Sequence, residues 1–223
     1  MKTKTITRVI RVPQTLTGIP YDVYVTLRDA PGNDQLRMTY HDGVLEFMAP
    51  AEFRHERGCH TLGMIVLAYS FVFDIPCEGA RSTTFRRGLP GELKGAGKEP
   101  DQSYYFADNA EYVREKDTLD LEIDPPPDLW IEVDNKASSK NRLPLYADLG
   151  IPEVWRYQVR RRSLWFGSLK NGEYVKIDRS LRLPKLTPDI VLDLVDEARK
   201  RGQTAWDRWM RNWMDTTLRN AKD

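Results

Sequence analysis

The order of predicted strands and helices along this 223-residue chain indicates an α/β fold. Strand-like segments stand on both sides of one long helical segment, and further strands and helices follow it. Hydrophobic residues make up 40% of the chain and charged residues 30%, which allows both a core and a polar surface. A chain of this length fits one compact domain with a terminal extension. We expect the domain to span residues 1–186 and a helical extension to span residues 187–223.

The first third of the chain is predicted to contain three strands and one long helix. Residues 21–27 alternate and are rich in Tyr and Val, which indicates a strand. Residues 36–40 and 44–48 flank an Asp-Gly pair, which is typical of a hairpin turn. From residue 51 to residue 73 the apolar residues recur at spacings of three and four, so this segment is predicted to be helical.

The middle of the chain is predicted to form strands separated by loops. Strands are expected at residues 82–86, 102–106 and 128–133, and the last of these is apolar apart from its carboxylates, as a central strand is. Residues 88–97 contain four glycines and a proline, so a loop is expected there. A charged connection, residues 107–124, precedes the last strand.

The final part of the chain alternates again between helix and strand. Ser138 or Ser139 is expected to cap a short helix that ends at Leu149, before Gly150. Three strands follow, at residues 153–157, 163–168 and 173–177. Residues 189–219 are predicted to form two helices that break near Gly202. One stripe of tryptophans should dock the last helix on the domain or on a second copy of the chain: Trp206, Trp209 and Trp213.

Charge and cysteine usage restrict the class of protein. The formal net charge is only +1, with 34 Lys and Arg against 33 Asp and Glu, so any nucleic-acid-binding surface must be local. Cys59 and Cys77 form no CxxC pair, which excludes a zinc ribbon. No apolar run approaches the ~20 residues that a membrane-spanning helix needs. The basic N-terminus lacks the apolar segment of a secretory signal. We therefore expect a cytoplasmic protein with reduced thiols and no membrane partner.

Two predicted strands carry a carboxylate whose position needs an explanation. Asp101 precedes the strand at 102–106, and Glu132 alternates with Ile131 and Val133. Each alone is compatible with a structural role, as a turn residue or as a half-exposed glutamate on an edge strand. Two carboxylates on neighbouring strands can together hold Mg²⁺, which prefers oxygen ligands. A metal in such a position suits phosphodiester hydrolysis.

Five segments between residues 40 and 177 form a more specific pattern. They read His41-Asp-Gly-Val-Leu-Glu-Phe-Met-Ala-Pro50, Arg54-His-Glu-Arg57, Glu99-Pro-Asp101, Pro126-Pro-Asp-Leu-Trp-Ile-Glu-Val-Asp134 and Arg142-Leu-Pro-Leu-Tyr-Ala-Asp-Leu-Gly-Ile-Pro-Glu-Val-Trp155. The pattern resembles the Uma-two family of PD-(D/E)XK endonucleases. That resemblance implies a restriction endonuclease-like mixed central sheet flanked by helices, with an N-terminal β-hairpin region and C-terminal helices.

The resemblance also implies roles for individual residues. Asp101 would be the aspartate of the motif and Glu132 its second acidic residue, and both would bind Mg²⁺ or Mn²⁺. Glu56 would be the helix carboxylate that completes such a catalytic site. Its alternative is a solvated position at a helix N-terminus, where the helix dipole favours negative charge. Asp128 and Asp134 are further candidate ligands.

One position departs from the full motif. A lysine would stand two residues after Glu132, where this chain has Asp134. A cation elsewhere must replace it if the chain cleaves DNA. Lys140 is the first candidate, at the opening of the short helix, and Lys136 is the second. Arg142 is the third, better suited to a static charge than to proton transfer because a guanidinium stays charged.

Three functions are compatible with these residues. The retained carboxylates favour a Mg²⁺-dependent endonuclease that acts on DNA. The missing lysine favours a non-catalytic nucleic-acid-binding or interaction module with the same fold. A dimerising scaffold built on the tryptophan-rich C-terminal helix is a third hypothesis, so a homodimer is possible. The densest basic run, Arg160-Arg-Arg162, is a solvated turn in the simplest interpretation, but it could contact phosphates and make DNA binding steeply dependent on salt.

Overall fold

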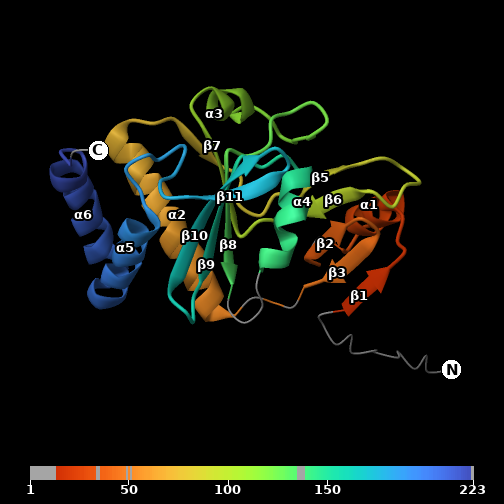
Figure 1. The fold of residues 1–223 in the computed structure, drawn as a ribbon, viewed down its shortest axis with the longest axis horizontal. Coiled ribbons are helices and arrows are strands. Elements are labelled where there is room, and N and C mark those ends of the chain that lie inside the picture. Colours follow the sequence, from red (N-terminus) through yellow and green to blue (C-terminus); the bar gives the residue numbers. More distant parts are fainter. Residues whose placement is uncertain (1–13, 34–35, 49, 51, 135–138, 222–223) are drawn as a thin grey trace.

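The structure is a computed structural model that describes residues 14–221, except 34–35, 49, 51 and 135–138. Its described residues form two sheets with helices packed against them (Figure 1). The fold class expected from the sequence, a mixed α/β fold with a mixed sheet flanked by helices, is confirmed. No helix among the described residues combines the length and the apolar character that a membrane crossing requires.

The smaller sheet contains five strands, all antiparallel to their neighbours, and lies at the right of Figure 1. Its strand order is β1 (Gln14–Thr17), β3 (Val44–Phe47), β2 (Met38–His41), β6 (Gly95–Lys98) and β5 (Phe85–Gly88). Helix α1 (Tyr21–Asp29) packs Tyr21 and Tyr24 on it, around Tyr40. The predicted hairpin is confirmed, with both turn residues, Asp42 and Gly43, at positive φ.

The larger sheet contains six strands and is mixed. Its order is β11 (Glu173–Ile177), β10 (Ser163–Lys170), β9 (Glu153–Gln158), β8 (Leu129–Asp134), β7 (Gln102–Phe106) and β4 (Cys77–Gly79). Only β8 and β9 are parallel among these pairs, and their connection contains the 3₁₀ helix η1 (Ser139–Arg142) and helix α4 (Leu143–Asp148). Parallel neighbours require such a crossover, whereas the other strands can follow one another through turns.

Helices cover both faces of the larger sheet. Helices α2 (Phe53–Phe73), α5 (Pro188–Arg201) and α6 (Gln203–Trp213) bury one face, and α3 (Asp108–Val113) and α4 bury the other. A short π-helical segment, Met214–Leu218, continues α6. Two glycines let α2 approach the strands closely. A Cβ on Gly58 would lie 3.0 Å from Val133 Cγ1, and one on Gly63 would lie 2.8 Å from the Tyr104 hydroxyl.

The strand predicted at residues 21–27 is wrong, because these residues form helix α1. Its buried side chains are Tyr21 and Tyr24, three residues apart, whereas Val23 faces solvent. The alternation of Tyr and Val suited a strand, but packing of the two tyrosine rings around Tyr40 requires helical spacing. Local β-propensity was overridden by tertiary contacts.

The loop predicted at residues 88–97 is also wrong in part, because strand β6 begins at Gly95. Gly95, Ala96 and Gly97 have little intrinsic preference for a strand. They are held in one by pairing with β2 on one side and β5 on the other. A Cβ on Gly97 would lie only 2.4 Å from the Tyr24 hydroxyl, so the close approach of α1 requires glycine here.

Most of the remaining strand and helix predictions hold with small shifts, but the short helix expected after Ser138 or Ser139 begins only at Leu143, behind the 3₁₀ helix η1. The strands of the larger sheet from β7 to β11 lie within two residues of their predicted limits, and the long helix begins at Phe53. The terminal helices break at Gly202, which has φ of 71°. The strand predicted at 82–86 begins later, at Phe85, and short elements were not predicted: β1, β4 and α3.

We predict that Trp206 anchors the C-terminal helix. Its ring is 1% exposed inside the main core, whereas Trp209 and Trp213 are partly exposed and stack on each other. Trp206→Ala should lower the free energy of unfolding by ~3–5 kcal/mol, measured by urea titration, because it leaves a large cavity. Trp209→Ala is the matched control and should cost clearly less. Equal losses would contradict this role for Trp206.

Candidate functional site

The two sheets are joined by a three-residue segment, residues 99–101, that carries the predicted aspartate. Strand β6 of the smaller sheet ends at Lys98, and strand β7 of the larger sheet begins at Gln102. Gln102 pairs with Ile131 in the antiparallel β7–β8 ladder, so Asp101 comes beside Glu132 as that register continues. The two residues expected to bind a metal therefore lie on neighbouring strands, at the junction between the sheets.

Asp101 is held by contacts from three elements. Its Oδ2 accepts a hydrogen bond from the Val133 amide at 2.9 Å and lies 3.1 Å from His55 Nε2. Its Oδ1 accepts from the Arg37 guanidinium at 3.1 Å. Burial opposes ionisation, but the His55 hydrogen bond, the Lys98 charge and the Val133 amide hold the pKa of Asp101 well below its usual range. This carboxylate is therefore ionised at neutral pH.

Glu132 is buried and paired with a lysine from the other sheet. Its Oε1 lies 3.3 Å from Lys98 Nζ and accepts a 2.6 Å hydrogen bond from the Trp130 indole. The exposed fractions of the Lys98 and Glu132 side chains are only 4% and 5%. Burial raises the pKa of Glu132, although the Lys98 charge and the Trp130 hydrogen bond act in the opposite direction.

Lys98 was not identified from the sequence, where every candidate cation lay after Glu132. It stands three residues before Asp101, directly after the loop that was predicted at residues 88–97. Its ammonium also donates to the Glu99 carbonyl at 3.1 Å. A lysine two residues before the Pro-Asp pair is the signal that could have drawn attention to it. The burial of Lys98 follows from the pairing of β6 with β2 on one side and β5 on the other, which the sequence did not predict.

Two arginines of the smaller sheet region complete the junction. Arg28 lies 2.9 Å from Glu99 Oε1, and Arg37 lies 3.8 Å from Glu99 Oε2 while it also binds Asp101. The smaller-sheet side of the junction therefore contributes Arg28 and Arg37, both paired with Glu99, and Asp101 and Glu132 lie at the strand ends of the larger sheet.

Glu56 reaches this junction only through its neighbour. His55 Nδ1 lies 3.1 Å from Glu56 Oε1, and His55 Nε2 contacts Asp101. The Glu56 side chain is 48% exposed. The hydrogen bond to Asp101 raises the pKa of His55, with a further contribution from Glu56, against the effect of burial. The His55 imidazole therefore bridges the carboxylates of Glu56 and Asp101.

The cations predicted from the sequence have different surroundings. Lys136 lies outside the described residues, and only the backbone of Lys140 is described, at the beginning of η1. Arg142 donates a hydrogen bond to the Glu46 carboxylate at 2.9 Å, and its positive charge acts to lower the pKa of Glu132.

The two additional ligand candidates are engaged in structural contacts. Asp128 is buried, accepts from the Phe106 amide at 2.8 Å and from the Asn109 side chain at 3.0 Å, and pairs with Arg182. Asp134 lies 3.6 Å from Arg156. These contacts tie Asp128 to β7 and α3, and Asp134 to β9.

The donors at the junction suit a hard cation better than zinc. Ligand atoms of His55, Cys59 and Asp101 lie within 4.8 Å of one another. Burial raises the pKa of the Cys59 thiol, and a thiol must lose its proton to bind zinc. The carboxylates of Asp101 and Glu132 instead offer the oxygen atoms that Mg²⁺ and Mn²⁺ prefer. The residues present therefore fit a hard divalent cation.

Comparison with known proteins gives a family and a related fold. The family model Uma2, described as "Putative restriction endonuclease", matches residues 24–195. A similar crystal structure is that of a "putative nuclease belonging to DUF820" from Anabaena variabilis, with a TM-score of 0.50 and 13% sequence identity. The match covers 78% of this chain and 98% of that chain, and at this identity it concerns the fold alone. No curated protein matches the chain.

We predict that the buried ion pair at the junction is costly to break. Lys98→Met keeps most of the side-chain volume but leaves Glu132 without its cation, so it should destabilise the protein by ~3–5 kcal/mol in chemical unfolding. The double variant Lys98→Met/Glu132→Gln should recover part of that loss. Lys94→Met, at an exposed lysine four residues earlier, is the control. Equal effects of Lys94→Met and Lys98→Met would contradict the pairing.

We also predict that the imidazole of His55 titrates above the ordinary value near 6.5. Because the pKa is raised in the folded state, the stabilisation it represents is complete below about pH 6.5 and is lost as pH rises through the raised value. Asp101→Asn removes the largest cause and should lower the pKa of His55, measured by NMR titration of the ring protons. An unchanged titration in Asp101→Asn would show that the contact is absent in solution.

Proposed function

Because this chain belongs to the Uma2 family, we propose that it is a metal-dependent endonuclease that hydrolyses phosphodiester bonds of DNA. The observation that carries the proposal is the pair of carboxylates, Asp101 and Glu132, on adjacent strands beside the buried ammonium of Lys98. The family and the related fold support a nuclease. The choice of DNA follows the family description, and the choice of a divalent metal follows the paired carboxylates of the junction.

Asp101 and Glu132 are the residues that would hold the metal. Mg²⁺ or Mn²⁺ bound there would polarise the phosphate and make hydroxide available near neutral pH. Asp101 is prepared for this role because it is ionised and is oriented by the Val133 amide and by His55. Glu56 acts at one remove, by positioning His55 through the Nδ1 contact. Glu56 is therefore a positioning residue in this proposal.

Lys98 takes the part of the missing motif lysine. Its ammonium lies 3.3 Å from Glu132 and its charge acts on Asp101, so it stands beside both proposed ligands. A fixed cation in a site with little water stabilises negative charge that develops on a phosphate far better than one in bulk solvent. Lys98 replaces Lys140 as the first candidate, and Lys140 stays in the experiment as the alternative.

One observation favours the second function, a non-catalytic binding module. The protein's own cations already compensate the carboxylates, with Lys98 at Glu132 and Arg37 and His55 at Asp101. A junction neutralised in this way can be stable without a metal. The two functions differ in whether an added metal displaces these contacts and the site then cleaves DNA.

The test combines plasmid nicking with calorimetric metal titration. With Mn²⁺, the wild type should nick supercoiled DNA, and Asp101→Asn and Glu132→Gln should lose both metal binding and nicking. Lys98→Met should keep metal binding but lower turnover by ~10²–10³-fold, as expected for loss of one transition-state contact. Lys94→Met should behave as wild type.

The outcomes separate the hypotheses. Full activity of Lys98→Met together with an inactive Lys140→Ala would assign the cation to Lys140. Circular dichroism must first show that each variant is folded at the assay temperature. Metal binding without nicking by the wild type, with Mg²⁺ and with Mn²⁺, would support the non-catalytic module instead.

A further inference from the structure

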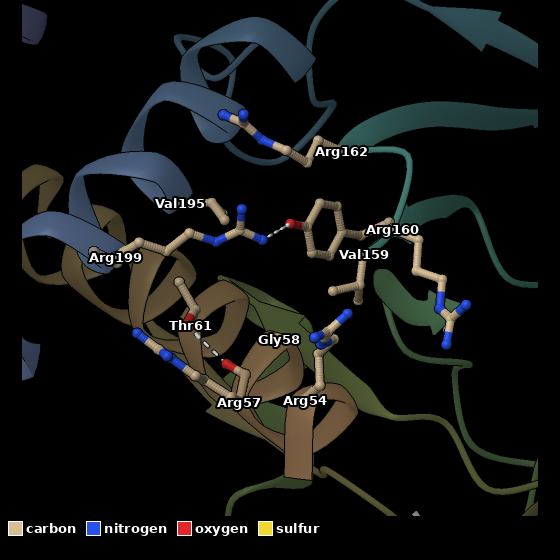
Figure 2. Close-up of a pocket in the computed structure, with 11 residues that line it drawn as sticks. Arg54, Arg57, Gly58, Thr61, Val159, Arg160, Arg162, Val195 and Arg199 are labelled. Atoms are coloured by element: carbon tan, nitrogen blue, oxygen red, sulfur yellow. Dashed lines mark hydrogen bonds between the residues drawn. The ribbon is translucent and has the colours of Figure 1, made fainter. Parts of the chain in front are cut away.

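A cavity of about 500 Å³ lies outside the junction, between α2, the turn after β9 and α5. Figure 2 shows the arginines that reach it from these three elements. Tyr157, Val159 and Val195 contribute apolar surface, and the lining contains no carboxylate. Five of its eleven residues are arginines: Arg54, Arg57, Arg160, Arg162 and Arg199.

Three of these five arginines have no carboxylate partner among the residues that the structure describes. Asp196 pairs with both Arg162 and Arg199. Across the part of the chain that the structure describes, no carboxylate forms an ion pair with the other three: Arg54, Arg57 and Arg160. The whole chain has a formal net charge of only +1, so this concentration of cations is a local feature. Like charges gathered in this way raise the affinity of the cavity for an anion.

The contacts of the paired arginines show a site that is arranged before any ligand arrives. Arg199 donates to the Tyr157 hydroxyl at 3.2 Å and lies 3.8 Å from Asp196. Arg162, from the turn, is held by the same aspartate. A guanidinium is planar and always charged, and its N–H groups match the oxygen atoms of a phosphate in pairs. Phosphate is therefore the ligand group that this cavity suits best.

The cavity adjoins the proposed catalytic junction through α2. Arg54 and Arg57 flank His55 in the first turns of this helix, and His55 contacts Asp101. Gly58, which lines the cavity, would place a Cβ 3.0 Å from Val133, whose amide binds Asp101. Both arginines therefore lie within two residues of the histidine that contacts Asp101.

We propose that this cavity binds backbone phosphates of the nucleic-acid strand that flank the cleaved bond. The ligand class rests on the proposed nuclease function, whereas the preference for phosphate rests on the arginines alone. The lining contains no Asn, Gln, Asp or Glu, the side chains that read adenine and cytosine, so apart from guanine contacts by the arginines little is available to recognise a base. Phosphate contacts position a strand without reading its sequence. Binding here should therefore be insensitive to sequence.

The experiment measures binding without cleavage. Fluorescence anisotropy with a labelled 20-nucleotide single strand and its duplex, in EDTA, reports affinity across a range of salt concentrations. The triple variant Arg54→Gln/Arg57→Gln/Arg160→Gln should bind at least about tenfold more weakly at 0.1 M salt. It should reduce the salt slope of the binding constant by about 2–3. The loss should be equal for different DNA sequences.

A matched control removes the same charge from the β10–β11 hairpin. Lys170→Gln/Lys176→Gln/Arg179→Gln changes three exposed cations around the β10–β11 hairpin and should bind DNA as the wild type does. Circular dichroism confirms that both triple variants are folded. Equal losses in the two triple variants would overturn the proposal, since the effect would then come from overall charge. Absence of DNA binding by the wild type would also overturn it.

Two further arms separate this proposal from its alternatives. If free nucleotide or pyrophosphate competes as well as an oligonucleotide of equal phosphate concentration, the cavity is a small-anion site and the strand proposal fails. If the wild type binds DNA through these arginines but nicks nothing with Mg²⁺ or Mn²⁺, the cavity stands and the proposed catalysis fails. If the wild type nicks DNA and the arginine variant binds DNA normally, the proposed catalysis stands and the cavity proposal fails.

Discussion

Lys98 and Glu132 bring one positive and one negative charge into the interior at the point where the two sheets meet. Removing either ion from water costs several kcal/mol, and only a close partner offsets that cost. The pair therefore constrains the docking of the smaller sheet, because β6 must end where its lysine reaches β8. The chain then has only Glu99 and Pro100 between Lys98 and Asp101. Asp101 is consequently fixed beside Glu132, where the Val133 amide binds it.

This constraint also divides the junction by charge. The region around the smaller sheet supplies cations, from Lys98, Arg37 and Arg28, and the larger sheet supplies carboxylates. Substrate phosphate and metal would both have to enter between these two sets of charges. A metal would compete with the protein's cations for the carboxylates, and a phosphate would compete with the carboxylates for the cations. Arrival of both at once leaves every charge with a partner, which neither achieves alone.

The larger sheet could be predicted from the sequence because its strands are apolar runs whose burial does not depend on fine detail. Residues 102–106 and 128–133 were placed correctly, and so was the proximity of Asp101 to Glu132. The smaller sheet could not be predicted as well, because packing rather than propensity forms α1 and β6. Lys98 lies at the end of that misjudged strand, so the candidate cations taken from the sequence all followed Glu132.

The arginine cavity could not be predicted from the sequence for a different reason. Its residues come from positions 54–61, 157–162 and 195–199, and only the run at 160–162 is basic enough to stand out locally. Helix α2 brings these segments together with the carboxylates. One side of its first turns contacts Asp101 through His55, and another carries Arg54 and Arg57 into the cavity. Because Gly58 lets that helix rest on Val133, the distance between the two sites is set by direct packing. A strand bound by the arginines is thereby held at a fixed distance from the carboxylates that would act on it.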